Sequence, residues 1–264
     1  MAAVGPSKAV PFPGARGVTL ITGASAGLGV HFARQCRERG DELVLVARRR
    51  ERLEALAAEL GSTHVIAADL AEPDAPRRLL DEVAARGLEV DTLINNAGFG
   101  ATGTFVATPR ERLLEMIDLN VRSLTDLCRL VLPAMIERRR GGILNVASTA
   151  AFQAGPYAAV YYASKAYVLS LTEALHHEAK GSGVKVSALC PGPTATEFFE
   201  VAGSPNSKLA RVAVRPEGVV AAGLKGLDRN APIVIPGIAN KVGAFGTRLM
   251  PRAALRRIVA SLKS

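Results

Sequence analysis

Short apolar runs recur along the chain and alternate with longer segments of helical periodicity. The apolar runs cover residues 18–21, 43–46, 64–68, 92–94, 143–146, 184–189 and 233–235. They lack the strict apolar–polar alternation of a half-exposed strand, so each is typical of a strand buried on both faces. The pattern therefore predicts a parallel sheet of about seven strands with helices on both faces.

The segments between these runs place apolar residues at helical spacing. Residues 50–60 carry Leu53, Leu56, Ala57 and Leu60 on one face, with charged residues opposite. Residues 111–137 and 157–180 are predicted as the two longest helices. Because strands and helices alternate, we expect a single Rossmann-type, doubly wound α/β domain with right-handed crossovers.

No internal repeat or low-complexity linker divides the chain of 264 residues, a length that suits one α/β domain. Residues 1–16 are rich in Ala, Gly and Pro, and we expect them to form a flexible leader. Residues 17–236 are expected to form the dinucleotide-binding and catalytic domain. Residues 237–264 are expected to form a basic amphipathic C-terminal extension.

A glycine-rich turn follows the first predicted strand and opens a predicted helix. Its sequence is Thr22-Gly23-Ala24-Ser25-Ala26-Gly27-Leu28-Gly29. Glycines allow a tight turn and a close approach to a pyrophosphate, and the helix N-terminus supplies amide donors. A turn without a ligand is the alternative, but its place in the first βα unit favours a dinucleotide site.

Tyr161 stands four residues before Lys165, which places both side chains on one face of the predicted helix. Neither Tyr157 nor Tyr162 has a lysine at this spacing. A lysine ammonium one turn away lowers the pKa of a tyrosine, which makes the phenol a better acid or base at neutral pH. This pair is therefore the candidate proton-transfer unit.

Two further polar residues follow the predicted elements. Ser148 comes just after the fifth predicted strand, and Asn120 lies in the long helix before it. Ser148 is placed to donate a hydrogen bond to a substrate oxygen, and Asn120 to hold a water behind Lys165. Taken singly, each residue has an ordinary structural role as its alternative. Together with the tyrosine and the lysine they favour a catalytic set.

With these motifs, and with Asn95-Asn96-Ala97-Gly98 after the fourth strand, the chain resembles the short-chain dehydrogenase/reductases from residue 18 to about 236. Its segments at 47–49 and 190–199 are most similar to the ketoacyl-reductase-like branch. The resemblance implies that Asn120, Ser148, Tyr161 and Lys165 are catalytic. It implies cofactor contacts from Gly23, Ser25, Gly27, Leu28, Gly29, Arg48, Arg49, Asp69, Leu70, Asn96, Ala97, Gly98, Tyr161, Lys165, Pro191, Gly192, Thr194 and Thr196.

The end of the second predicted strand bears on the choice of cofactor. NAD-binding folds carry an acidic residue there for the ribose 2′-hydroxyl. Here the position is Ala47, and Arg48 and Arg49 follow it. Arg48 is placed to pair with a 2′-phosphate, and Ser25 to add a hydrogen bond. The alternative is that the arginines only begin a solvated helix. We expect NADP(H) to be preferred over NAD(H).

Residues 196–211 correspond to the substrate lid of the family that the chain resembles. Phe198 and Phe199 suggest an apolar cover, with simple lid packing as an equal alternative. We therefore expect reduction of a hydrophobic ketone or aldehyde, or oxidation of the alcohol. A 3-oxoacyl-thioester reductase is one alternative and a non-catalytic NADP-binding regulator is another. The intact catalytic set argues against the regulator.

The net charge of +9 is concentrated near the end of the chain, because no acidic residue follows Asp228. With aromatic residues at only 5%, we do not expect nucleic-acid binding. In the last segment Leu255, Ile258, Val259 and Leu262 form an apolar stripe beside arginines. We expect this stripe to pack on the domain or on a partner subunit, while weak contact with an anionic membrane is the alternative.

Cys36, Cys128 and Cys190 are too few and too scattered for a disulfide framework or a metal cluster, and no metal site is expected. No signal peptide or membrane span is expected, because polar residues interrupt the uncharged stretch 141–164. That stretch better suits the interior of a site. A cytoplasmic location is expected. The resemblance implies a homodimer or homotetramer that pairs the helices bearing Asn120 and Tyr161.

Overall fold

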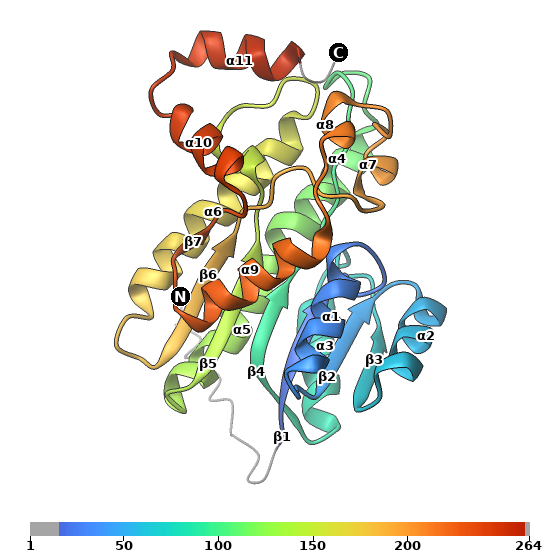
Figure 1. Ribbon diagram of the computed structural model, residues 1–264. Helices are drawn as coiled ribbons and strands as arrows, with labels where there is room; N and C mark the ends of the chain where they lie inside the picture. The colour runs from blue at the N-terminus through green and yellow to red at the C-terminus, as the bar shows by residue number, and fades with distance from the viewer. Residues whose placement is uncertain (1–15, 262–264) are drawn as a thin grey trace, which may run out of the picture.

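Seven parallel strands form one sheet in the computed structural model, which describes residues 16–261. The predicted leader lies outside these residues, apart from Arg16 at the start of the first strand. The strand order is β3-β2-β1-β4-β5-β6-β7. The strands are β1 Arg16–Thr22, β2 Leu43–Ala47, β3 Thr63–Ala67, β4 Leu88–Asn95, β5 Gly141–Val146, β6 Val184–Leu189 and β7 Ile233–Val234. The chain winds outward from β1 in both directions (Figure 1), so the doubly wound fold is confirmed.

All seven predicted strands are present, and they differ from the prediction mainly at their ends. β4 already begins at Leu88, and the edge strand β7 is reduced to two residues. The other edge strand, β3, is only partly buried, whereas every residue of β2 is buried. The prediction that each strand is buried on both faces therefore holds better for the central strands than for the edge strands.

Helices cover both faces of the sheet (Figure 1). On one face lie α1 Leu28–Glu38, α2 Arg50–Leu60 and α9 Pro216–Asp228. On the other lie α3 Ala75–Ala85, α5 Leu124–Glu137 and α6 Ala159–Glu178. Alternate residues of each strand enter opposite layers: Leu43 and Leu45 of β2 pack on the first side, and Val44 and Val46 on the second.

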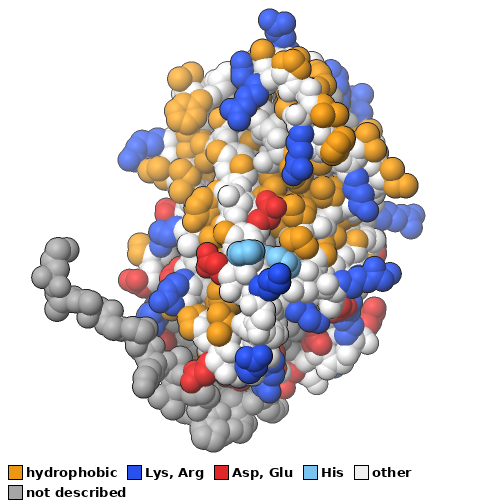
Figure 2. All heavy atoms as spheres, turned by 90° about the vertical axis from the view of Figure 1, so that its left-hand side faces the viewer, with side chains coloured by type: hydrophobic (Ala, Val, Ile, Leu, Met, Phe, Trp, Pro, Cys, Tyr) orange, Lys and Arg blue, Asp and Glu red, His pale blue; other side chains and the backbone are white. Residues whose placement is uncertain are grey.

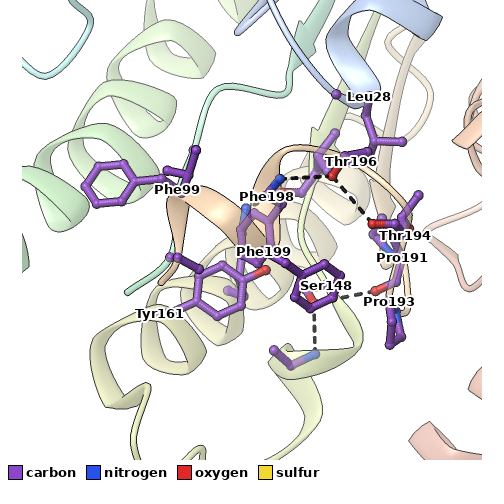
Figure 3. A pocket seen from close by; sticks show the side chains of 18 of the residues that line it. Leu28, Phe99, Ser148, Tyr161, Pro191, Pro193, Thr194, Thr196, Phe198 and Phe199 are labelled. Atoms are coloured by element: carbon purple, nitrogen blue, oxygen red, sulfur yellow. Dashed lines mark hydrogen bonds between the residues drawn. The ribbon is translucent and has the colours of Figure 1, made fainter. Parts of the chain in front are cut away.

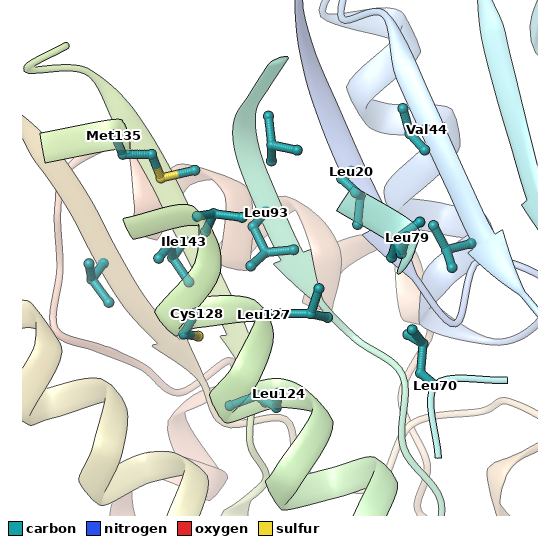
Figure 4. Packing of buried hydrophobic residues seen from close by; sticks show 14 of the residues in the cluster. Leu20, Val44, Leu70, Leu79, Leu93, Leu124, Leu127, Cys128, Met135 and Ile143 are labelled. Carbon is teal, nitrogen blue, oxygen red and sulfur yellow. The ribbon is translucent and has the colours of Figure 1, made fainter. Parts of the chain in front are cut away.

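The second layer is shown in Figure 4, where Met135 and Leu127 of α5 meet Leu93 of β4 and Ile143 of β5. These four side chains are almost fully buried. Truncating such a residue to alanine typically costs about 2–5 kcal/mol of stability. This layer fixes the strand ends from which the site residues follow.

The long helix predicted over 111–137 is interrupted, which corrects the sequence interpretation. Its first part is α4 Arg110–Ile117, followed by a π-helical turn at Asp118–Ser123 and then by α5. Asn120 lies within the π-helical turn, where its side chain bonds the backbone of Phe99. Such turns often occur at functional sites, and apolar periodicity does not reveal them because the axis continues.

The helix predicted over 157–180 begins at Ala159 and ends at Glu178. Tyr157 has φ +61°, which is left-handed backbone and excludes it from the helix. The shortened helix still contains both Tyr161 and Lys165.

Four short helices complete the upper part of the molecule in Figure 1. They are α7 Phe198–Val201, α8 Lys208–Arg211, α10 Ile238–Gly246 and α11 Arg252–Ser261. Val259 of α11 belongs to a hydrophobic cluster with Ala150, Ala158 and Tyr162, and Leu255 packs against that cluster. The expected packing on the domain therefore holds for these two residues of the α11 stripe. Leu262 lies outside the described residues. None of the helices between residues 16 and 261 has the length and hydrophobicity that a membrane span requires.

Candidate active site

A cavity of about 670 Å³ lies over the C-terminal ends of the strands and receives most of the predicted site residues. It is lined by the glycine turn, by the segments that follow β2 to β6, and by residues of α6, α7, α10 and α11. Every predicted cofactor residue except Gly29 lines it, and so do Ser148, Tyr161 and Lys165. Asn120 and Gly29 are buried and do not line the cavity.

The glycine turn has the backbone that a close approach to a pyrophosphate requires. Gly23 has φ +66°, and a Cβ there would lie 2.8 Å from Cα of Ala97. A Cβ on Gly29 would lie 2.1 Å from the carbonyl oxygen of Gly23, so only glycine allows α1 to begin this close to β1. The glycine turn therefore places the N-terminus of α1 at the wall of the cavity. The free backbone N–H groups there are suited to a phosphate anion.

Thr22 joins the glycine turn to the Asn-Asn-Ala-Gly motif. Its Oγ1 accepts hydrogen bonds from the backbone N–H groups of Asn96 and Ala97, at 3.0 and 2.9 Å. The Asn96 amide donates to the carbonyl oxygens of Thr22 and Gly23, at 2.9 and 3.2 Å. The two predicted cofactor segments are thus held side by side as one rigid unit.

Two arginines line the cavity after β2, and each is already paired with a carboxylate. Nη1 of Arg48 lies 3.1 Å from Oε1 of Glu115 and 3.6 Å from Oδ2 of Asp69. Arg49 donates to Oγ of Ser25 at 3.2 Å and lies 3.4 Å from Glu197. The sequence favoured Arg48 with Ser25 as the 2′-phosphate site, whereas the structure places Arg49 against Ser25. Glu197, which sequence reasoning missed, pairs with Arg49 and with Arg52.

Tyr161 and Ser148 meet inside the cavity, from α6 and from the segment after β5 (Figure 3). Burial raises the pKa of Tyr161 to about 12, while hydrogen bonding with Ser148 lowers it by less. Ser148 is held by Ala150, whose N–H donates to its Oγ at 3.1 Å. The expected lowering of the Tyr161 pKa by Lys165 is therefore wrong for the chain alone, because loss of hydration dominates.

Lys165 is buried beneath the tyrosine. Its Nζ lies 5.9 Å from the centroid of the Tyr161 ring and donates to the carbonyl oxygen of Val146 at 2.7 Å. Burial lowers the pKa of Lys165 to about 8. The ammonium thus faces the ring from below and still lines the cavity, within the region of the predicted cofactor contacts.

The side chain of Asn120 is fully engaged in protein contacts. Its Oδ1 accepts from the N–H of Phe99 at 3.1 Å, and its Nδ2 donates to the carbonyl oxygen of Phe99 and to Oγ of Ser164, at 3.0 and 3.1 Å. It therefore ties the segment after β4 to α6 beside the tyrosine. Its role as the holder of a water stays a prediction.

The side of the cavity next to the Tyr161 ring is largely apolar. The ring centroid of Phe198 lies 5.3 Å from that of Tyr161, and Phe199 packs on Phe198 at 5.8 Å (Figure 3). Sequence reasoning missed the contribution of the C-terminal helices, which line the same cavity with Ala239, Asn240, Gly243, Ala244, Thr247, Leu255, Ile258 and Val259. The small residues at helical spacing in 239–247 were the available signal.

All three cysteines are free and buried. Burial raises the pKa of the Cys190 thiol, next to the cavity, to about 12. This thiol therefore stays protonated at neutral pH and is not an activated nucleophile. Among the described residues no group of three or more His, Cys, Asp or Glu could hold a metal ion.

The short chain dehydrogenase family matches residues 17–206. The very-long-chain 3-oxoacyl-CoA reductase of Anas platyrhynchos is 33% identical over 209 residues, which are 75% of this chain and 66% of the duck protein. The NADP-dependent 3-hydroxy acid dehydrogenase of Salmonella typhi is 38% identical over 190 residues, 70% of this chain and 75% of that protein.

Among solved structures, a short-chain dehydrogenase from Sphingobium yanoikuyae in complex with NADPH is similar over most of its length. It is 34% identical, superimposes with a TM-score of 0.78, and covers 89% of this chain and 94% of its own.

Proposed function

Since the chain belongs to the short chain dehydrogenase family, we propose that it is an oxidoreductase that interconverts a carbonyl compound and its alcohol with NADP(H). The observation that carries the proposal is the meeting of Tyr161, Ser148 and Lys165 in the cavity that also contains the cofactor-type glycine turn. The residues present fit a dinucleotide, because Gly23 and Gly27 line the cavity where α1 begins, and the backbone N–H groups of a helix N-terminus suit a pyrophosphate. A bound nicotinamide would supply the hydride.

The chain's own residues supply the proton and hold the oxygen. The Tyr161 hydroxyl is the acid in reduction, and its raised pKa keeps it protonated in the chain alone. Ser148 donates to the substrate oxygen as one arm of a small oxyanion site. The carbonyl oxygen of Val146 holds Lys165 one helical turn from Tyr161. The positive charge of Lys165 there lowers the free energy needed to form a tyrosinate. Asn120 fixes the segment that carries Gly98 and Phe99.

We propose NADP(H) as the preferred cofactor because the place of the NAD-type acidic residue is taken by Ala47, and Arg48 and Arg49 follow it along the cavity wall. A 2′-phosphate would gain charge-assisted hydrogen bonds from guanidinium groups there. Ser25 is positioned to add a further bond beside Arg49. The Sphingobium structure with NADPH and the NADP-dependent Salmonella relative support this choice.

The proposed substrate is hydrophobic, because Phe198, Phe199, Leu255 and Val259 line the substrate side. Reduction of a 3-oxoacyl thioester is a second candidate, favoured by the similarity to the duck 3-oxoacyl-CoA reductase. A non-catalytic NADP-binding regulator is a third possibility, and the intact arrangement around Tyr161 argues against it.

A panel assay with NADPH absorbance as readout separates these candidates. The panel contains aliphatic aldehydes, bulky aryl ketones and 3-oxoacyl thioesters, each compared with Tyr161→Phe as the matched inactive control. Turnover of bulky ketones supports the first proposal, and turnover confined to thioesters supports the second. NADPH binding without turnover of any compound would instead favour the regulator.

We also propose a homodimer or homotetramer that pairs the α4–α5 and α6 helices, because Leu114, Ile117, Ile136 and Tyr167 expose apolar surface there. Light scattering on the purified chain tests this assembly. A cytoplasmic location is proposed as well, since three free cysteines suit a reducing compartment.

A further inference from the structure

Helix α10 has two faces with different surroundings. One face lines the cavity with small residues, among them Gly243 and Ala244. The other carries Ile238, Val242 and Phe245 at helical spacing, and Leu249 follows in the next turn. Their exposed fractions are 81%, 66%, 62% and 74%. These four residues are named here the C-terminal apolar stripe. Figure 2 faces the side on which Figure 1 shows α10, and apolar side chains gather over the upper part of that face.

The stripe is surrounded by positive charge. Five exposed basic residues lie on α10, on α11 or in the turn between them: Lys241, Arg248, Arg252, Arg256 and Arg257. Among residues 16–261 none of the five is in an ion pair. No acidic residue follows Asp228 in the sequence, so this part of the chain cannot neutralise itself.

We propose that the C-terminal apolar stripe and its basic rim dock on the surface of an anionic phospholipid bilayer. A helix with an apolar face and Lys or Arg beside it buries that face at the headgroup boundary while its cations contact lipid phosphates. The long side chains of Arg248 and Lys241 reach the headgroups past the apolar residues. The apolar surface alone marks an interaction site, and the unpaired cations select a negatively charged partner.

A second copy of the chain fits this surface less well. A twofold contact through the stripe would bring the same five cations together from both copies. Since residues 229–264 contain no Asp or Glu, that contact would lack compensating side-chain charge from this region.

Docking would place the cavity one helix away from the bilayer. The face of α10 opposite the stripe lines the cavity, next to Leu255 and Val259 of α11. A hydrophobic carbonyl compound dissolved in the membrane would thus meet the apolar side of the cavity first. This last consequence rests on the proposed function, whereas the docking itself does not.

Tryptophan fluorescence tests the docking without any catalytic readout, because the chain contains no tryptophan. Phe245→Trp places the probe on the stripe. Phe105→Trp is the matched control, since Phe105 precedes α4 and is 64% exposed, close to the value for Phe245. Vesicles of phosphatidylcholine alone are compared with vesicles that also contain phosphatidylglycerol.

We expect emission of the Phe245→Trp variant to move to shorter wavelength with the anionic vesicles only, and to return at high salt. The Phe105→Trp variant should not respond. In flotation with the unlabelled full chain, replacing Lys241 and Arg248 by Gln should lower vesicle binding by about fivefold for each charge. Val242→Ser with Phe245→Ser should also lower it, whereas Phe105→Ser with Val106→Ser should not.

Retained melting temperature and NADPH binding show that each variant is folded. The proposal is overturned if no variant or parent chain binds anionic vesicles at low salt, or if both tryptophan probes respond alike. Equal binding to neutral and to anionic vesicles would show that the basic residues do not contribute to docking. This outcome would also overturn the proposal. A wavelength shift without vesicles that grows with protein concentration identifies a second copy as the occupant instead.

Discussion

Arg49 and Glu197 form an ion pair, with Nη1 3.4 Å from Oε2, that joins the segment after β2 to the residue that precedes α7. Arg52 approaches the same carboxylate at 2.8 Å, and these contacts lower the pKa of Glu197. The guanidinium proposed for the 2′-phosphate is therefore shared with a protein anion. An exposed pair of this kind contributes little stability, so its main consequence concerns binding of the cofactor.

Glu197→Gln is expected to improve NADPH binding. The substitution removes a carboxylate that competes with the 2′-phosphate for Arg49, and an exposed pair is worth about a two- to fivefold change in affinity. NADH binding should not change, because NADH lacks the phosphate. Fluorescence titration with both cofactors measures the effect, and Glu200→Gln in α7 is the control. Equal improvement for the two cofactors would contradict the competition.

Arg49→Ala and Arg48→Ala are each expected to weaken NADPH binding by about 10- to 100-fold, the usual effect of losing a charge-assisted partner. NADH binding should change little. Arg50→Ala is the control, because Arg50 pairs with Glu54 and does not line the cavity. An equal loss of both cofactors would show that the arginines support the fold and do not select the phosphate.

The strands were predictable because each central strand buries both faces, so its apolar run carries the signal. The apolar pattern did not predict the π-helical turn that contains Asn120. Such a turn changes the backbone hydrogen bonds while the helix axis continues. Sequence reasoning also failed for the Tyr161 pKa, since spacing along a helix reveals a neighbouring lysine but not the burial of the phenol. The ion pairs of Glu197 with Arg49 and Arg52 join segments far apart in the sequence, so no local sequence pattern predicts them.

Tyr161→Phe is expected to lower kcat by at least about 100-fold, the contribution typical of a general acid. The ring contact with Phe198 is retained, so NADPH binding should stay the same. Steady-state kinetics with the best compound of the panel measure the loss. Tyr162→Phe, on the adjacent buried ring, should keep most of the activity. The reverse outcome would move the catalytic role to Tyr162.

Lys165→Met is expected to remove a dependence of the fold's stability on pH between 8 and 10.5. The pKa of Lys165 falls from 10.5 to about 8 on folding, so the unfolded chain binds more protons between these values. The parent chain therefore gains stability from Lys165 as pH rises from 8 to 10.5, by about 3 kcal/mol in total, and loses the same amount as pH falls from 10.5 to 8. Denaturant unfolding should show a difference between variant and parent that shrinks over this range. A constant difference would mean that Lys165 is not desolvated.

Asn120→Leu is expected to destabilise the chain by about 2–4 kcal/mol, because it leaves the buried N–H and carbonyl groups of Phe99 without their partner. The leucine also removes the bond to Ser164. Ser164→Ala serves as the control, because it loses this contact and the bond from Ser164 Oγ to the Tyr161 carbonyl oxygen but leaves the groups of Phe99 paired. The control should cost about 1 kcal/mol. Urea unfolding measures both variants, and kcat is measured beside it. If Asn120→Leu keeps its stability and loses only kcat, the amide acts in proton transfer, as the sequence suggested, and not as the clamp between Phe99 and α6.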